Sequence, residues 1–204
     1  MLAYKFRGAD QIPFALDIIV NQRLYCSNPS TFNDPLEGAF SSIIFEGIEH
    51  TKKAHDQVMP ECLNLCICSL SMTLESYYAS GFSGIAIEID IPKEALEVKV
   101  IRYTNYPALG SLAQDDPERA AIESLCMKRK EWSHKKEVRI IIDSRRVHTA
   151  PYYRLEVPVH RIIVGNRIEP ALLQVLKLVS RDQDINLCGI RLGQEGLETV
   201  KIPL

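Results

Sequence analysis

The chain has 204 residues, of which 46% are hydrophobic and 25% charged, so it has an ordinary globular composition and enough length to bury a sizeable core. Its formal net charge of -2 provides no argument for nucleic acid or an anionic membrane as its partner. No apolar run approaches the ~20 residues that cross a bilayer, and residues 1–7 lack the apolar core of a signal peptide. We therefore expect a cytoplasmic protein with a single domain over residues 1–204.

The first part of the chain mixes strand and helix patterns. Alternation over 2–7 predicts a strand that places Lys5 and Arg7 on one face. A helix follows, for which Asp10 is the expected cap and Asn21 the expected stop. Further strands are predicted over 24–26, 38–45, 63–70 and 85–91, helices over 49–58 and 73–80, and a helical turn over 93–96.

The second part contains two clear helices among strands. Asp115 or Asp116 before Pro117 predicts a helix start, with Ile122 and Leu125 on the buried side. A second amphipathic helix is predicted over 170–180, and strands over 98–103, 137–142, 152–157, 161–164 and within 187–203. Strands outnumber helices and do not alternate with them regularly. This favours an α+β fold with a mixed, largely antiparallel sheet and flanking helices.

Residues 24–35 form a polar segment that ends a short strand. Pro29 and Pro35 exclude regular helix and central strand, so the backbone is constrained. Tyr25 and Phe32 are expected to anchor the segment to a core. Its polar side chains, which bond readily to nearby backbone, are Ser27, Asn28, Ser30, Thr31, Asn33 and Asp34. Such a loop either presents functional groups or turns a corner, and Asn33-Asp34 either binds a cation, orients a base or forms an Asx turn.

Two pairs of charged residues have strand spacing. Glu137 and Arg139 share one face of their strand, so a carboxylate and a guanidinium can converge on a ligand. The alternative is a cross-strand ion pair or a solvated face. Lys5 and Arg7 can likewise receive a phosphate or carboxylate, or form an exposed surface pair.

The densest basic patch surrounds Trp132, and its cations are Lys128, Arg129, Lys130, Lys135 and Lys136. This patch is either a local binding surface or the solvated end of a helix, where Lys and Arg favour the last turn.

Six cysteines occur without a secretion signal, which favours buried, reduced thiols. The spacing of Cys62, Cys66 and Cys68 admits a metal site. Structural zinc needs four ligands, however, and the histidines are scattered along the chain, so buried thiols are preferred and no metal is assigned.

A set of motifs occurs in order between residues 4 and 165. They are Tyr4-Lys5-Phe6-Arg7, Leu24-Tyr25-Cys26-Ser27 with Pro29, Phe32-Asn33-Asp34-Pro35, Tyr78-Ala79, residues 84–90, Trp132-Ser133 with Glu137 and Arg139, and Ile162-Ile163-Val164-Gly165. Together these motifs resemble a bacterial protein family known only as a domain of unknown function. The resemblance implies a family but no reaction. The chain departs from the family pattern at Glu75, Tyr77, Phe82 and Lys135, where family members usually carry Trp, His, His and Glu.

Arg7, Ser27 and Glu137 follow one another in this order along the chain. That order is similar to the ADP-ribosyltransferase superfamily, in which an Arg or His, a Ser or Tyr and a Glu hold the dinucleotide. The similarity implies NAD as cofactor or substrate and rests on fold analogy. No Gly-x-Gly-x-x-Gly motif or phosphate-binding loop ending in Gly-Lys-Ser/Thr is present.

Three hypotheses follow. The first is a small enzyme that binds a nucleotide-like substrate, with Glu137 and Arg139 as catalytic residues and Lys5, Arg7, Ser27, Phe32, Asn33, Asp34 and Tyr78 as ligand-binding residues. The second is a non-catalytic module that binds protein or nucleic acid, with an exposed apolar or basic patch near Trp132. The third is a degenerate family member without activity.

Overall fold

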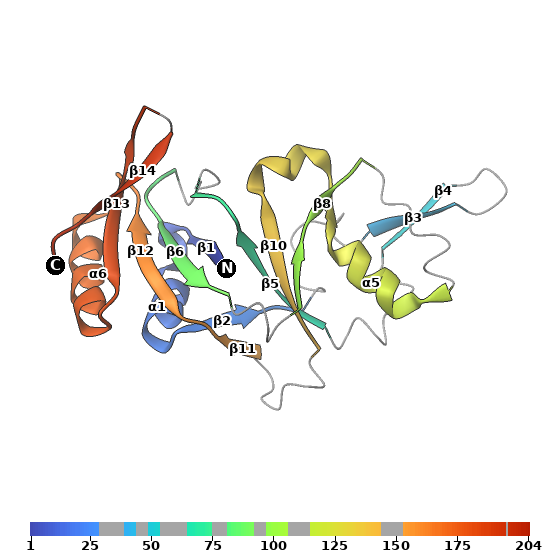
Figure 1. The fold of residues 1–204 in the computed structure, drawn as a ribbon, viewed down its shortest axis with the longest axis horizontal. Coiled ribbons are helices and arrows are strands. Elements are labelled where there is room, and N and C mark those ends of the chain that lie inside the picture. The colour runs from blue at the N-terminus through green and yellow to red at the C-terminus, as the bar shows by residue number, and fades with distance from the viewer. Residues whose placement is uncertain are drawn as a thin grey trace. The chain divides into compact units, whose positions relative to one another are not determined.

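The structure, a computed structural model, describes residues 1–28, 39–43, 49–53, 65–74, 81–91, 97–105, 115–143, 153–194 and 196–204 (Figure 1). They divide into two units. Unit 1 comprises Met1–Tyr25, Ser69–Ala95 and Arg154–Leu204, and unit 2 comprises Cys26–Cys68 and Leu96–Tyr153. The boundary falls within strand β5 (Leu65–Ser71), whose last three residues belong to unit 1.

Unit 1 is built on a sheet with the strand order β14-β13-β12-β6-β1, followed by the end of β5. The strands are β1 (Leu2–Arg7), β6 (Ile85–Asp90), β12 (Val159–Val164), β13 (Asn186–Leu192) and β14 (Leu197–Lys201). Strands β12 and β13 are parallel, and the other pairs are antiparallel. A short pair of β2 (Arg23–Cys26) and β11 (Tyr153–Glu156) accompanies this sheet.

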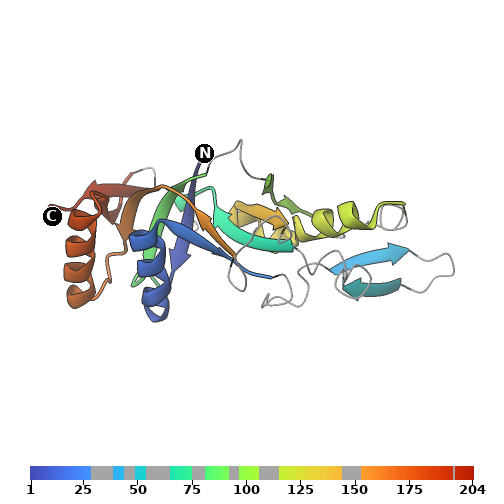
Figure 2. The same cartoon turned by 90° about the horizontal axis from the view of Figure 1, so that it is seen from below.

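Two helices lie on one face of the unit 1 sheet (Figure 2). Helix α1 (Ile12–Asn21) buries Ala15, Ile18 and Ile19, and helix α6 (Pro170–Asp182) buries Leu176 and Ser180. A short 3-10 helix, η1 (Ala9–Gln11), leads into α1. Helix α6 connects β12 to β13, as a crossover between parallel strands requires.

The other face of the unit 1 sheet carries a row of apolar side chains. Phe6, Ala86, Ile163 and Cys188 occupy matched positions on four neighbouring strands. The last three form a buried cluster, and Tyr4, Phe6, Leu74, Phe82 and Ile190 pack against it. Side chains on a strand alternate between faces, so Tyr4 and Phe6 point away from α1, whereas Lys5 and Arg7 point toward it.

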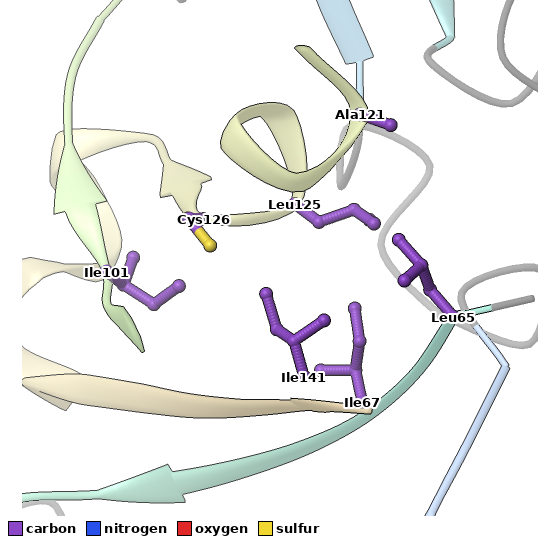
Figure 3. Close-up of a cluster of buried hydrophobic side chains, with 7 residues drawn as sticks. All are labelled: Leu65, Ile67, Ile101, Ala121, Leu125, Cys126 and Ile141. Atoms are coloured by element: carbon purple, nitrogen blue, oxygen red, sulfur yellow. The ribbon is translucent and has the colours of Figure 1, made fainter. Parts of the chain in front are cut away.

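Unit 2 contains the start of β5, followed in the sheet by β10 (Glu137–Asp143) and β7 (Glu97–Val100). Two further pairs are β3 (Ala39–Ile43) with β4 (Glu49–Lys53), and β8 (Arg102–Tyr103) with β9 (Met127–Lys128). Helix α5 (Pro117–Leu125) precedes the 3-10 helix η4 (Lys130–Lys135). The core of unit 2 joins α5 to these strands through Leu65, Ile67, Ile101, Ala121, Leu125, Cys126 and Ile141 (Figure 3).

The α+β fold with a mixed, largely antiparallel sheet and flanking helices is confirmed. The predicted cap of α5 is also confirmed, because the Asp116 carboxylate accepts a hydrogen bond of 3.1 Å from the backbone N–H of Arg119. None of the helices that the structure describes has the length and apolar character to cross a membrane. The prediction of one domain over the whole chain stays a prediction.

Three local predictions are wrong. Residues 49–53 form β4 rather than the start of a helix, since pairing with β3 outweighs the weak helical propensity of a polar segment. Asp10 lies within η1 and does not cap α1, whose N-cap is Gln11. Tyr25 is 42% exposed and therefore does not anchor the adjoining segment to the core.

Candidate functional site

The predicted catalytic pair lies in unit 2 and forms a buried charge cluster with a lysine. Arg139 Nε donates to Glu137 Oε1 at 2.8 Å, and Lys128 Nζ donates to Glu137 Oε2 at 2.5 Å. The side chains of Arg139 and Glu137 are 1% and 7% exposed. The predicted pair is therefore an ion pair within one strand, and the alternative of a solvated face is wrong.

The surrounding strands position this cluster at the start of β10. Lys136 adopts a left-handed backbone conformation with φ 41° and ends η4, and Glu137 begins the strand directly after it. Strands β8 and β9 pair Tyr103 with Lys128. The hydroxyl oxygen of Tyr103 then accepts a hydrogen bond of 2.7 Å from the Glu137 backbone N–H. Short strands far apart in the sequence thus bring three polar side chains together.

Arg139 also links the cluster to helix α5. Its Nη1 donates to the backbone oxygen of Leu125, the last residue of that helix, at 2.5 Å. A helix C-terminus carries unsatisfied carbonyl groups and a partial negative charge, which a guanidinium neutralises. This contact gives Arg139 a structural role that the strand pattern did not predict.

The electrostatics of the cluster keep Glu137 ionised. Burial acts to raise the pKa of Glu137, but the positive charges of Arg139 and Lys128 and their hydrogen bonds outweigh it and hold this pKa below its usual value. A carboxylate with a lowered pKa is a weak general base. Each carboxylate oxygen of Glu137 already accepts a hydrogen bond from a cationic side chain of the protein. The cluster therefore suits a structural role in unit 2.

The predicted cations of the first strand lie in unit 1. Lys5 Nζ donates to the backbone oxygen of Ser69 at 2.8 Å, and the Arg7 guanidinium lies 6.0 Å from the centroid of the Phe14 ring on α1. Both side chains are thus in contact with the rest of unit 1. The geometry gives them packing and bonding partners within unit 1.

Ser27 is in unit 2 and is held by an isolated bridge to β5. Its backbone N–H and C=O exchange hydrogen bonds of 2.9 and 2.8 Å with Ile67, and its hydroxyl donates to Ile67 O at 3.4 Å. The remaining predicted ligand-binding residues, Phe32, Asn33, Asp34 and Tyr78, lie outside the residues that the structure describes. Because Arg7 belongs to unit 1 and both Ser27 and Glu137 belong to unit 2, their convergence stays a prediction.

The basic patch divides into a buried and an exposed part. Lys128 belongs to the buried cluster, since its side chain is 11% exposed. The other part lies on and beside η4 and is called here the Trp132 surface; it consists of Arg129, Lys130, Trp132, His134, Lys135 and Lys136. Lys135 is partly buried, and the other five residues are exposed. Trp132 is 38% exposed, and Lys135 Nζ lies 4.2 Å from its ring centroid. The His134 ring lies 6.1 Å from the same ring, tilted by 42°.

The described cysteines are buried thiols, as expected: Cys26, Cys66, Cys68, Cys126 and Cys188. Burial raises the pKa of Cys66 to about 12. Within the described ranges, no group of three or more His, Cys, Asp or Glu side chains is arranged to hold a metal ion. Cys62, the first residue of the candidate metal motif, lies outside those ranges.

Sequence reasoning missed a second buried charge pair, in unit 1. Glu88 on β6 is 1% exposed and bonds Arg161 on β12, with Nη2 and Oε2 at 2.8 Å. The available signals were a glutamate between isoleucines in 85–91 and an arginine beside the apolar run that ends at 164. Charged residues within apolar strands are seldom buried unless they are paired.

No protein-family model matches this chain, and neither a curated protein nor a solved structure matches it. The resemblance of its motifs to a bacterial family, and their similarity to ADP-ribosyltransferases, therefore stay predictions.

Proposed function

We propose that this chain is a non-catalytic interaction module whose Trp132 surface binds single-stranded nucleic acid. The observation that carries the proposal is the exposure of Trp132 on a short helix flanked by cations. Exposed aromatic rings among Lys and Arg side chains let bases stack while the cations contact phosphates.

The charge of the Trp132 surface supports an anionic partner. Residues 129–136 contain four Lys or Arg side chains and one acid, Glu131, which bonds Arg129 at 3.0 Å. This local excess of positive charge contrasts with the net charge of -2 of the whole chain. An electrostatic contact of this kind is local and salt-dependent.

The ring of Trp132 supports a partner with flat aromatic groups. The Lys135 ammonium lies over the Trp132 ring. A phosphate can therefore pair with this ammonium while a base stacks on the Trp132 ring. Helix η4 has six residues and spans about 12 Å at the rise of a 3-10 helix. A surface of this length contacts few nucleotides, so we expect weak binding without sequence preference.

The alternative, a small enzyme acting on a nucleotide-like substrate such as NAD, is supported less well. It assigns chemistry to Glu137 and Arg139, whose polar atoms bond Lys128, each other and the C-terminus of α5. A catalytic group needs to reach a substrate within hydrogen-bond distance, and these side chains are almost fully buried. A degenerate member that retains this scaffold without activity is compatible with the same geometry.

The fluorescence of Trp132 tests the proposal directly, because the chain contains a single tryptophan. Titration with an oligothymidylate at low salt is expected to quench the emission saturably and to weaken steeply as salt rises. Lys130→Glu should weaken binding. It should also lower the slope of the logarithm of the binding constant against the logarithm of the salt concentration by about one. Lys201→Glu, an equal charge change at an exposed position of unit 1, is the matched control and should change binding little.

Two further comparisons identify the kind of molecule that binds. Trp132→Leu, followed by anisotropy of a labelled oligonucleotide, should weaken binding to the oligonucleotide more than binding to heparin, which has negative charge but no bases. Absence of quenching at low salt contradicts the proposal. An equal effect of Lys130→Glu and Lys201→Glu also contradicts it, since binding would then follow net charge rather than this surface.

A further inference from the structure

A row of polar side chains crosses the unit 1 sheet on the face opposite α1 and α6. Strand register places Tyr4 beside Ser71 on one side and Glu88 on the other, and Glu88 beside Arg161. Arg161 is in turn beside Asn186 on β13. This row lies next to the apolar row that contains Phe6 and Ala86, so one sheet face presents both kinds of side chain.

The centre of the polar row is an ion pair between Glu88 and Arg161. Arg161 Nη2 donates to Glu88 Oε2 at 2.8 Å, and Arg161 Nη1 donates to Thr199 Oγ1 on β14 at 3.2 Å. Tyr4 lies beside Glu88 in the strand register, and burial, followed by the interaction with Glu88, raises the pKa of Tyr4. The Thr199 hydroxyl is therefore bonded to the pair, and the Tyr4 side chain lies next to it.

Half of the ion pair is not made. Oε1 of Glu88 and Nε of Arg161 are both buried, and neither has a hydrogen-bond partner. The two atoms belong to groups that bond through Oε2 and Nη2, so they are the open half of a two-pronged carboxylate–guanidinium contact. His160 Nε2 lies 3.7 Å from Oε1, which is too long for a hydrogen bond.

Leaving these atoms unpaired is unfavourable. A buried donor or acceptor without a partner destabilises the fold, and more so when the group is charged. A single group that both donates and accepts can satisfy both atoms, by donating to the carboxylate oxygen and accepting from the guanidinium N–H. A hydroxyl has this property, whereas an ammonium only donates and an ionised carboxylate only accepts.

We propose that Glu88 and Arg161 bind a hydroxyl group of a small neutral polyhydroxyl ligand, such as a sugar. The charges of the two side chains cancel, which disfavours a strongly charged ligand. Tyr4 and Phe6 lie beside the pair with parallel rings, 6.4 Å between centroids and 5° between planes. Both side chains lie on the same sheet face as the pair, and apolar groups of this kind can contact the carbon atoms of a sugar ring. The Arg161 side chain is 29% exposed, so it provides the route from solvent.

The experiment follows the Arg161 Nε–H group by nuclear magnetic resonance in the full-length protein. Its resonance is assigned by its loss in Arg161→Lys. D-glucose, D-mannose and glycerol are added separately at increasing concentration. At least one sugar is expected to shift the resonance saturably and to slow its exchange with solvent. No saturable shift with any of the three probes overturns the proposal.

Variants of the protein distinguish a sugar from His160 and from water as the partner of Glu88 and Arg161. Glu88→Gln should weaken sugar binding about tenfold or more, and Tyr4→Phe should also weaken it if Glu88→Gln does not fold. His160→Ala should leave binding unchanged, because the histidine does not bond Glu88 in this structure. Loss of binding in His160→Ala, or a nuclear Overhauser contact from Nε–H to a water that persists at saturating sugar, overturns the proposal.

Discussion

The Nε atom of Arg139 lies 2.8 Å from Oε1 of Glu137, and the pair is buried at the start of β10. Two residues on the same face of one strand thereby neutralise each other, and Lys128 adds a second cation to the same carboxylate. Because the cluster also bonds the C-terminus of α5, it connects β9, β10 and α5 of unit 2.

Removing the Glu137 charge is expected to destabilise unit 2. Glu137→Gln keeps the shape of the side chain but removes the negative charge that Arg139 and Lys128 both bond. Breaking a buried ion pair in this way costs about 3 kcal/mol. Chemical denaturation measures the change in the free energy of unfolding. Glu131→Gln removes an exposed pair with Arg129 and should change stability by less than about 1 kcal/mol. Equal effects of the two variants would contradict a structural role for the cluster.

Stability is expected to fall in acid because of Glu137. Its pKa is held below the usual value in the folded protein, whereas in the unfolded chain it returns to about 4.3. The stabilisation is therefore fully present at pH values above the pKa of Glu137 in the unfolded chain. It is lost as the pH falls through the pKa of Glu137 in the folded protein. Urea unfolding at successive pH values from neutral to acid measures this. In Glu137→Gln the acid loss of stability should be smaller, and an unchanged pH profile would contradict the assignment.

Cys66 is expected to be chemically inert in the folded protein. Burial raises its pKa to about 12, so at pH 8 roughly one thiol in ten thousand is the reactive thiolate. Iodoacetamide treatment at pH 8, followed by peptide mass spectrometry, should leave Cys66 unmodified in the native protein and modify it in urea. Comparable rates of modification in the two states would show that the thiol is not protected.

Gly165 is expected to tolerate no side chain. A Cβ at this position would lie 1.9 Å from the backbone oxygen of Phe82, which cannot move without disturbing the turn that it forms. We expect Gly165→Ala to destabilise unit 1 by about 3 kcal/mol, at the upper end of the cost of overpacking. Gly189→Ala is the matched control, since its nearest atom is a side-chain carbon of Ile202 at 3.5 Å. Thermal unfolding of the two variants should differ clearly, and similar melting temperatures would contradict this account.

Much of the secondary structure could be predicted from local patterns. The alternation of isoleucines over 85–91 predicted β6, and Asp116 before Pro117 predicted the start of α5. Both signals depend on neighbouring residues alone. The helix predicted over 49–58 is wrong at Glu49–Lys53, because a polar segment has weak intrinsic preference and pairing with Ala39–Ile43 decided its conformation.

The candidate site was predicted less completely, for a physical reason. Spacing in the sequence correctly placed Glu137 and Arg139 on one strand face, since alternation is a local property. It did not indicate that Lys128, Tyr103 and the Leu125 carbonyl would surround them. It also gave no reason to pair Glu88 with Arg161, which lie 73 residues apart.

The sequence by itself determined the α+β class, most elements and the segment that carries Trp132, because hydrophobic periodicity and turn residues act over short distances. Only the tertiary structure decided which charges are buried and what they bond. Burial depends on which strands become neighbours, and that pairing is set by contacts between distant parts of the chain. The pairing of distant strands therefore produced a satisfied cluster at Glu137 and a half-made ion pair at Glu88.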